Sequence, residues 1–312
     1  MDILTDIILR AGRSAVELAF FVLLPVMVVM LSLMRLLEAR GVLDRVVHVL
    51  APVLRPTGLT GLGVFAALQI NFVSFAAPVA TLTMMESRGA SDRHLAATLA
   101  MVMAMAQANA SFPMIAMGLD FGITLLLSAV GGLAAAAATY HGFARGLSDA
   151  EGPVDETLHH RVAEDAKGVL DVINRAGAEA FKIAVGAIPM LVLALVAAMA
   201  LRSSGAIDLL THLLAPLMTA VSIDPALILP TLTKYIGGGT AMMGVMDEML
   251  REGSATPGIL NRSAGFLIHP LDVPGVAVLI SAGKRVANVW KPAALGAAVG
   301  ILVRSIGHTL LG

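Results

Sequence analysis

Apolar runs long enough to cross a membrane alternate with short polar interruptions along this chain of 312 residues. The first run, Ala15–Met34, contains a single charged residue, Glu17. A helix rises about 1.5 Å per residue and must cross about 30 Å of hydrocarbon, so about 20 apolar residues predict a membrane span. No small-residue cleavage site ends this run. It is therefore expected to be retained rather than removed as a signal peptide.

The pattern of the first half returns in the second half at an offset of 164 positions. Such a repeat predicts a duplicated fold. We expect a first repeat at residues 1–140, a polar linker outside the membrane at 141–176, and a second repeat at 177–312. The matching residues are Pro25 and Pro189, Gly41 and Gly205, Asp44 and Asp208, His48 and His212, Ala51 and Ala215, Pro52 and Pro216, and Gly89 and Gly253.

The sequence of each repeat predicts the same order of segments. A span kinked by a proline comes first, and a short amphipathic helix follows. Two long apolar segments with polar interruptions come next, and a helix rich in small residues ends the repeat. The first repeat has them at Ala15–Met34, Val42–Leu54, Gly61–Met85, Leu95–Gly118 and Phe121–Tyr140, and the second at Ile183–Leu201, Ala206–Leu217, Ala226–Leu250, Ser263–Gly283 and Val289–Leu311.

Composition supports an all-α polytopic membrane protein. Hydrophobic residues make up 57% of the chain and charged residues 14%, whereas soluble domains have about 45–50% and about 25%. The net charge of −1 gives no indication of nucleic-acid binding. The absence of cysteine excludes disulfides, thiolate metal sites and iron–sulfur clusters.

Two arrangements of the repeats stay open. Four crossings in each repeat make the repeats parallel and put both termini and the linker on one side of the membrane. One re-entrant segment in each repeat makes the number of crossings odd and inverts the second repeat, as in many transporters, and we favour this arrangement. A Lys/Arg excess on the side that the first arrangement gives to the termini favours cytoplasmic termini.

The polar interruptions are the candidate binding site. Unwound backbone within a membrane must find partners or line a cavity, and side-chain amides both donate and accept hydrogen bonds, as a base or a ribose requires. Hydrogen bonding between helices, and close helix packing at the glycines, are the structural alternatives. The candidate solute-binding residues are Gln69, Asn71, Ser74, Gln107, Asn109 and Ser111 in the first repeat and Lys234, Gly237, Gly238, Gly239, Thr240, His269 and Asp272 in the second.

Lys234 and Asp272 are the two formal charges among these candidates. A charged residue at the centre of a bilayer costs about 2.5–3.5 kcal/mol on insertion scales, so its presence suggests a function. Three interpretations stay open: a buried ion pair, a site that couples substrate or ion, and two residues without mutual contact. His269 is expected to be a hydrogen-bonded interior histidine.

No pattern typical of catalysis or of a metal site is present. His48 with Asp44, and His212 with Asp208, fit the polar face of an amphipathic helix. The sequence has no nucleophile–base set and no phosphate-binding or zinc motif. We therefore expect neither an enzyme nor a resident cofactor.

The polar motifs resemble those of the nucleoside recognition, or Gate, domain family of membrane proteins. They are Gln69-Ile-Asn71-Phe-Val-Ser74, the Thr233–Thr240 stretch and His269-Pro-Leu-Asp272-Val-Pro-Gly275, together with the repeated Gly-x-x-Asp-x-x-x-His-x-x-Ala-Pro. The resemblance implies a multi-pass protein of the bacterial inner membrane. Related domains occur in concentrative nucleoside transporters, ferrous iron permeases and spore maturation proteins. In the nucleoside transporters, re-entrant hairpins and unwound helices bind base and ribose, with sodium or proton coupling.

This chain departs from those relatives in two ways. It lacks the cysteine motifs of the iron permeases, and carboxylate signatures that grip ribose are not evident in its first repeat. We expect a transporter or permease for a small polar solute, nucleoside-like by resemblance, with Na⁺ or H⁺ as the candidate coupling ion. A non-transporting membrane subunit with a structural or regulatory role in the envelope is the alternative. The expected partners are the lipid bilayer, the solute, and further copies of this chain or another membrane subunit.

Overall fold

The computed structural model describes residues 2–150, 167–220 and 224–312, and every regular element in this part of the chain is a helix. Five of these helices are long and apolar enough to cross a membrane: Leu4–Ala39, Asp92–Ile115, Phe121–Phe143, Val169–Leu201 and Trp290–Leu311. The prediction of an all-α polytopic membrane protein is therefore confirmed.

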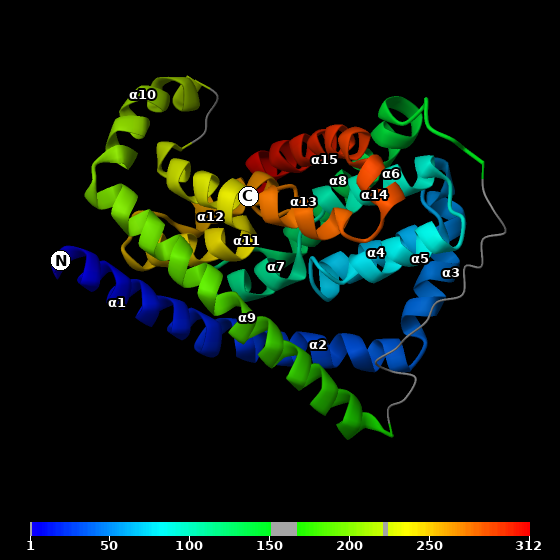
Figure 1. The fold of residues 1–312 in the computed structure, drawn as a ribbon, viewed down its shortest axis with the longest axis horizontal. Coiled ribbons are helices and arrows are strands. Elements are labelled where there is room, and N and C mark those ends of the chain that lie inside the picture. The colour runs from blue at the N-terminus through cyan, green and yellow to red at the C-terminus, as the bar shows by residue number, and fades with distance from the viewer. Residues whose placement is uncertain (1, 151–166, 221–223) are drawn as a thin grey trace.

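Two long helices pack against each other along one side of the molecule (Figure 1). The first combines α1 (Asp2–Glu17), a π-helical segment η1 (Leu18–Leu23) and α2 (Leu24–Ala39). The wide turn of η1 ends just before Pro25, which has no N–H to donate to the preceding turn. The second is α9 (Val169–Ser203). An ion pair between Arg35 near the end of α2 and Glu179 near the start of α9 fixes their antiparallel arrangement.

Helix α9 begins inside the range that was predicted for the linker. The linker was predicted to extend to residue 176, but α9 begins at Val169, and Val172 and Ala176 are buried. The polar side chains before the apolar run therefore belong to the span.

The amphipathic helix predicted after the first span is confirmed as α3 (Val42–Leu54). Through η2 (Arg55–Thr57) it turns by 106° into α4 (Gly61–Phe72). Val49 and Val53 on its outer face are exposed, as suits a helix at a membrane interface. Its counterpart is α10 (Ala206–Ala220).

Helix α4 and α5 (Pro78–Ser87) form a re-entrant hairpin, because both outer ends lie on one face of the molecule. At the start of the hairpin, the Gly58 carbonyl lies 2.7 Å from Nδ1 of His94. At its end, Glu86 accepts hydrogen bonds from the backbone N–H groups of Arg285 and Val286. We call this side the Arg285 face; the Arg285–Asp92 ion pair also lies on it.

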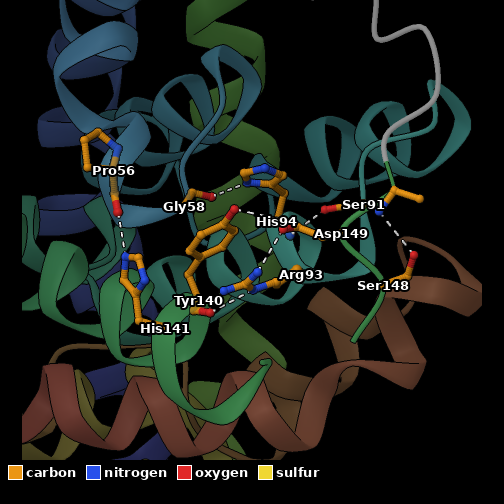
Figure 2. A network of polar contacts seen from close by, with 10 residues as sticks. Pro56, Gly58, Ser91, Arg93, His94, Tyr140, His141, Ser148 and Asp149 are labelled. Atoms are coloured by element: carbon orange, nitrogen blue, oxygen red, sulfur yellow. Dashed lines mark hydrogen bonds and ion pairs between the residues drawn. The ribbon is translucent and has the colours of Figure 1, made fainter. Parts of the chain in front are cut away.

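Figure 2 shows the polar network that ties the Arg285 face together. The Arg93 guanidinium lies 4.1 Å from the centre of the Tyr140 ring, donates to the Tyr140 carbonyl at 2.9 Å and pairs with Asp149 at 2.8 Å. His94 stacks on the same ring. Gly58 has a positive φ of 85°, and a side chain there would overlap Tyr140. Glycine is thus required where the chain enters the hairpin.

Two broken helices cross the molecule in opposite directions. The first, α6 (Asp92–Ala104) followed by α7 (Ala108–Ile115), runs away from the Arg285 face. The second, α12 (Pro257–Leu267) followed by α13 (Val273–Ile280), runs toward it and continues into α14 (Lys284–Asn288). The far side is the Asn261 face, where Asn261 donates to the Gly118 carbonyl and accepts from the Asp120 N–H at 2.7 Å.

The closing helices also run in opposite directions. Helix α8 (Phe121–Ala138), with η3 (Thr139–Phe143), starts at the Asn261 face, whereas α15 (Trp290–Leu311) ends there. Gly131 of α8 and Gly300 of α15 leave no room for a Cβ, so these two helix backbones nearly touch. The small-residue stretch Gly131–Ala138 therefore packs within this chain. Inverted repeats predict that matched segments run in opposite directions, as these helices do. The repeat itself stays a prediction.

A second hairpin precedes α12. After η4 (Pro225–Leu227), α11 (Ile228–Arg251) is interrupted at Gly238, whose φ of 84° and ψ of 177° are not helical. Leu229 from its start and Val245 and Glu248 from its end line one small pocket, so its two arms fold back on each other. With one hairpin in each half, Asp149 at the described start of the linker pairs with Arg93 on the Arg285 face, and Glu17 at the end of α1 pairs with Arg251 at the end of α11. This geometry favours the inverted arrangement over the one that put the termini and the linker on one side.

Candidate functional site

One cavity of about 510 Å³ lies where the polar interruptions meet. Its broken wall consists of the tips of both hairpins and the breaks of both crossing helices. Its continuous wall is formed by η1 and α9. The predicted site residues that line it are Ser74, Gln107, Asn109, Gly237, Gly238, Gly239, Thr240 and Asp272. Segments far apart in the sequence thus form one site between the two faces.

Asn109 connects three of these interruptions. Its carboxamide oxygen accepts a hydrogen bond of 3.2 Å from the Phe75 N–H at the tip of the α4–α5 hairpin. Its Nδ2 donates at 3.4 Å to the hydroxyl of Thr240 in the second arm of α11. Asn109 itself is in the first turn of α7. Both hairpin tips are therefore fixed relative to the α6–α7 break.

Lys234 and Asp272 form a buried ion pair, which selects the first of the three interpretations left open by the sequence. The Lys234 side chain is fully buried, and the Asp272 side chain is 2% exposed. The other carboxylate oxygen of Asp272 accepts from the Gly275 N–H at 2.7 Å and caps α13. A negative group at a helix N-terminus is stabilising. The pair joins α11 to the α12–α13 break.

Gln107 lies beside the glycines of α11. The residue is buried, with 2% of its surface exposed. A Cβ on Gly239 would overlap its Nε2, so glycine is required for this approach. At Gly238 the positive φ and the nearby Pro274 ring impose the same requirement. The glycine run therefore combines both interpretations given above: close packing, and backbone exposed to a cavity.

The remaining predicted residues lie behind the cavity wall rather than on it. Gln69 accepts a hydrogen bond of 2.7 Å from Thr81 and braces the two arms of the α4–α5 hairpin. Ser111 donates at 2.9 Å to the Gln107 carbonyl. Lys234 reaches the cavity only through Asp272. These residues shape the site without facing its contents.

Asn71 also acts from behind the wall. Its oxygen accepts from the Ser128 hydroxyl at 2.7 Å, and the Ser128 oxygen accepts from the Ala106 N–H at 2.8 Å. The hydrogen-bond chain therefore satisfies an unwound N–H in the α6–α7 break, as backbone at membrane depth requires. Ser128 was not predicted. It lies in a helix rich in small residues, where a serine is expected to serve close helix packing rather than a binding site.

His269 is completely buried in the α12–α13 break. Its Nδ1 accepts from the Leu271 N–H at 3.1 Å, and its Nε2 has no partner among the described residues. The expectation of an interior hydrogen-bonded histidine agrees with this geometry.

Arg304 is a buried residue that the sequence argument missed. Its guanidinium donates to the carbonyls of Ala104 at 2.6 Å, Ile268 at 2.9 Å and Ala264 at 3.4 Å. These carbonyls are at the C-terminal ends of α6 and α12, directly before the two breaks. A cation stabilises such ends. The available signal was an arginine in an otherwise apolar span.

Glu179 and Lys182 on the continuous wall were also missed. They lie between the predicted linker and the predicted apolar run, so neither pattern included them. Glu179 pairs with Arg35, which also binds Glu38 at 2.7 Å. Lys182 is exposed and has no ion-pair partner within the described part of the chain. The apolar residues of the same wall are Leu23, Ile183, Ala187 and Met190.

Residues 20–125 match the family model described as Gate: Nucleoside recognition. This confirms the resemblance seen in the sequence for that region. No curated protein matches the chain.

Solved structures of CNTnw, a concentrative nucleoside transporter, share the fold. The structure in an inward-facing substrate-bound state has a TM-score of 0.67 and 19% identity, and the alignment covers 94% of this chain and 74% of that chain. An outward-facing state of a CNTnw variant has a TM-score of 0.67 and 16% identity, with 99% and 83% covered. Together with the apolar helices, these matches support a multi-pass membrane protein with this fold.

Proposed function

We propose that this protein moves a small polar solute across the membrane and binds it in the cavity between the broken helices and α9. The observation that supports the proposal best is the convergence of four chain interruptions on one cavity. Unwound backbone within a membrane is tolerated where it lines a cavity. Discontinuous helices at a site between two repeats are the common design of secondary transporters.

The lining suits a solute with one polar and one flat apolar side. Gln107, Asn109, Ser74 and Thr240 supply donors and acceptors on the broken wall, and α9 supplies apolar contacts opposite them. A volume of about 510 Å³ lies within the range of about 300–1,000 Å³ typical of small-molecule sites. The match to a nucleoside recognition family makes a nucleoside-like solute the first to test.

Uptake into proteoliposomes tests the proposal. The purified chain should accumulate at least one radiolabelled solute from a panel of nucleosides, bases and sugars, and an imposed Na⁺ or H⁺ gradient should identify the coupling ion. Asn109→Ala should abolish uptake because it releases both hairpin tips. Asn174→Ala, on the exposed side of α9 outside the cavity, is the matched control and should leave uptake unchanged.

Absence of uptake for every solute would contradict transport. If the chain also co-purified with a stoichiometric membrane partner and showed no solute-dependent thermal shift, a non-transporting subunit of the envelope would be the better description. The proposed setting is the bacterial inner membrane, with further copies of this chain as candidate neighbours.

A further inference from the structure

We propose that the solute has a negatively charged group, a carboxylate or a phosphate monoester, that binds between Lys182 and the half-helix N-termini of the broken wall. This inference rests on the proposed function and specifies its substrate class. Not all charged residues that line the cavity are paired with a residue of opposite charge.

Lys182 is the unbalanced charge. The cavity is lined by three charged residues: Glu179, Lys182 and Asp272. Glu179 is paired with Arg35, and Asp272 with Lys234. Lys182 is exposed at the cavity and has no ion-pair partner within the described ranges. An ammonium group on the wall of a membrane cavity attracts an anionic ligand, and this attraction is stronger there than in water.

Half-helix N-termini add positive potential on the opposite wall. Helix α7 starts at Ala108, and no side chain caps it. The second arm of α11 starts after the break at Gly238. Each N-terminus has the equivalent of about +0.5 charge and presents N–H groups to an anion. Helix α13 is different, because the Asp272 carboxylate already caps it. The anionic group is therefore assigned to the side of α7 and α11.

Gln107 is an independent indication of a ligand at this place. It precedes α7, lines the cavity and is 2% exposed. Its side-chain amide makes no hydrogen bond to another described residue, and it is not one of the described polar groups enclosed without a partner, so it faces the cavity. A ligand in the cavity would satisfy its donor and acceptor groups. Its Nε2 lies next to Gly239, at the start of the second arm of α11. An anion there would accept from Gln107 and from the backbone of α7 and α11.

The test compares matched ligands on the full-length chain purified in lipid nanodiscs. Uridine, uridine 5′-monophosphate, the 5′-carboxylate of uridine and inorganic phosphate are the probes, and binding is measured by calorimetry. Both charged nucleosides should bind about tenfold more tightly than uridine, as a hydrogen bond to a charged group implies. Their affinity should fall as salt increases, whereas that of uridine should not.

Single substitutions identify the residues that cause the preference for charged ligands. Lys182→Gln should reduce the affinity for the charged ligands to that for uridine, and Lys182→Arg should keep most of the difference. Lys291→Gln, on an exposed position of α15 outside the cavity, is the matched control and should change nothing. Gln107→Leu should weaken the binding of the charged ligands without lowering the melting temperature, because the amide makes no hydrogen bond to another described residue.

The outcomes separate this inference from the proposed function. Tight binding and uptake of uridine, with weaker binding of its charged analogues, would overturn the inference and leave the transport proposal intact. Equal affinity of wild type and Lys182→Gln for the charged ligands would also overturn it. Inorganic phosphate that binds as tightly as the monophosphate would show that the organic part is not recognised and would contradict a nucleoside-like solute. Failure of every ligand to bind, together with failure of uptake, would contradict both proposals.

Discussion

At the scale of single residues, the buried Lys234–Asp272 ion pair stabilises the site. Removing one partner of a buried pair leaves an uncompensated charge, which costs about 3–5 kcal/mol. Lys234→Met should therefore destabilise the protein by about that amount. Adding Asp272→Asn should recover most of the loss, because the amide oxygen still accepts from the Gly275 N–H. Thermal unfolding of the two variants measures the difference; equal melting temperatures of Lys234→Met and wild type would contradict a structural pair.

Gly239 should control access to Gln107. A methyl group there overlaps the Gln107 amide, so Gly239→Ala should displace this side chain and reduce solute affinity by about 1.4 kcal/mol or more. Gly177→Ala is the control, because a Cβ there meets nothing within 4 Å. Unchanged solute affinity in Gly239→Ala would show that the close approach is not part of the site.

The candidates chosen from the sequence include eight of the twelve residues on the broken wall of the cavity and none of those on its continuous wall. Polar residues within apolar runs are conspicuous, and eight of the thirteen candidates line the cavity. Whether a residue faces the cavity or stands behind it depends on helix rotation, which polarity does not report. Asn71 and Asn109 look alike in sequence, yet Asn71 faces Ser128 and Asn109 faces both hairpin tips. Lys182 was missed because it lies between the predicted linker and the predicted apolar run.

At the scale of elements, similar polar interruptions produce opposite chain directions. The interruption after α4 turns the chain back, whereas the one after α6 lets it continue across. Local sequence does not decide this, because an amide and a serine lie in or beside each break: Asn71 and Ser74 at the first, and Gln107 and Ser111 at the second. Contacts of the outer ends decide it: Glu86 returns to Arg285, and α7 leads on to Asp120 at the Asn261 face. The sequence therefore predicted the breaks and left the number of crossings open.

Arg304 should hold the α6–α7 and α12–α13 breaks at a fixed separation. Arg304→Gln leaves at least one of the carbonyls of Ala104, Ile268 and Ala264 without its donor. Each unsatisfied buried group costs about 1–3 kcal/mol, so a loss of at least about 1 kcal/mol is expected. Denaturant unfolding measures it, with the exposed Arg262→Gln as a control that should stay within about 0.5 kcal/mol of wild type. A similar small effect for Arg304→Gln would contradict the bridging role.

At the scale of the whole molecule, the two faces differ in positive charge. The Arg285 face has the larger number of basic residues in its loops and helix ends, and the linker leaves from it. Cytoplasmic segments are enriched in Lys and Arg. We therefore expect the Arg285 face to be cytoplasmic and both termini to lie on the opposite side. This differs from the expectation of cytoplasmic termini, which assumed that the linker shares their side. Basic residues in the loops and helix ends of the Arg285 face include Arg40, Arg45, Arg55, Arg88, Arg93, Arg145, Lys284 and Arg285, and those of the Asn261 face include Arg10, Arg13, Arg251 and Arg262.

Single cysteines test this orientation cleanly, because the chain has none of its own. Ser87 is exposed at the end of α5 on the Arg285 face, and Ser254 is exposed between α11 and α12 on the Asn261 face. In intact cells a membrane-impermeant maleimide should label Ser254→Cys and should label Ser87→Cys only after permeabilisation. The reverse pattern would restore cytoplasmic termini. Labelling of both variants in intact cells, in equal amounts, would indicate that the chain inserts in two orientations, and a fixed charge bias would then not determine its topology.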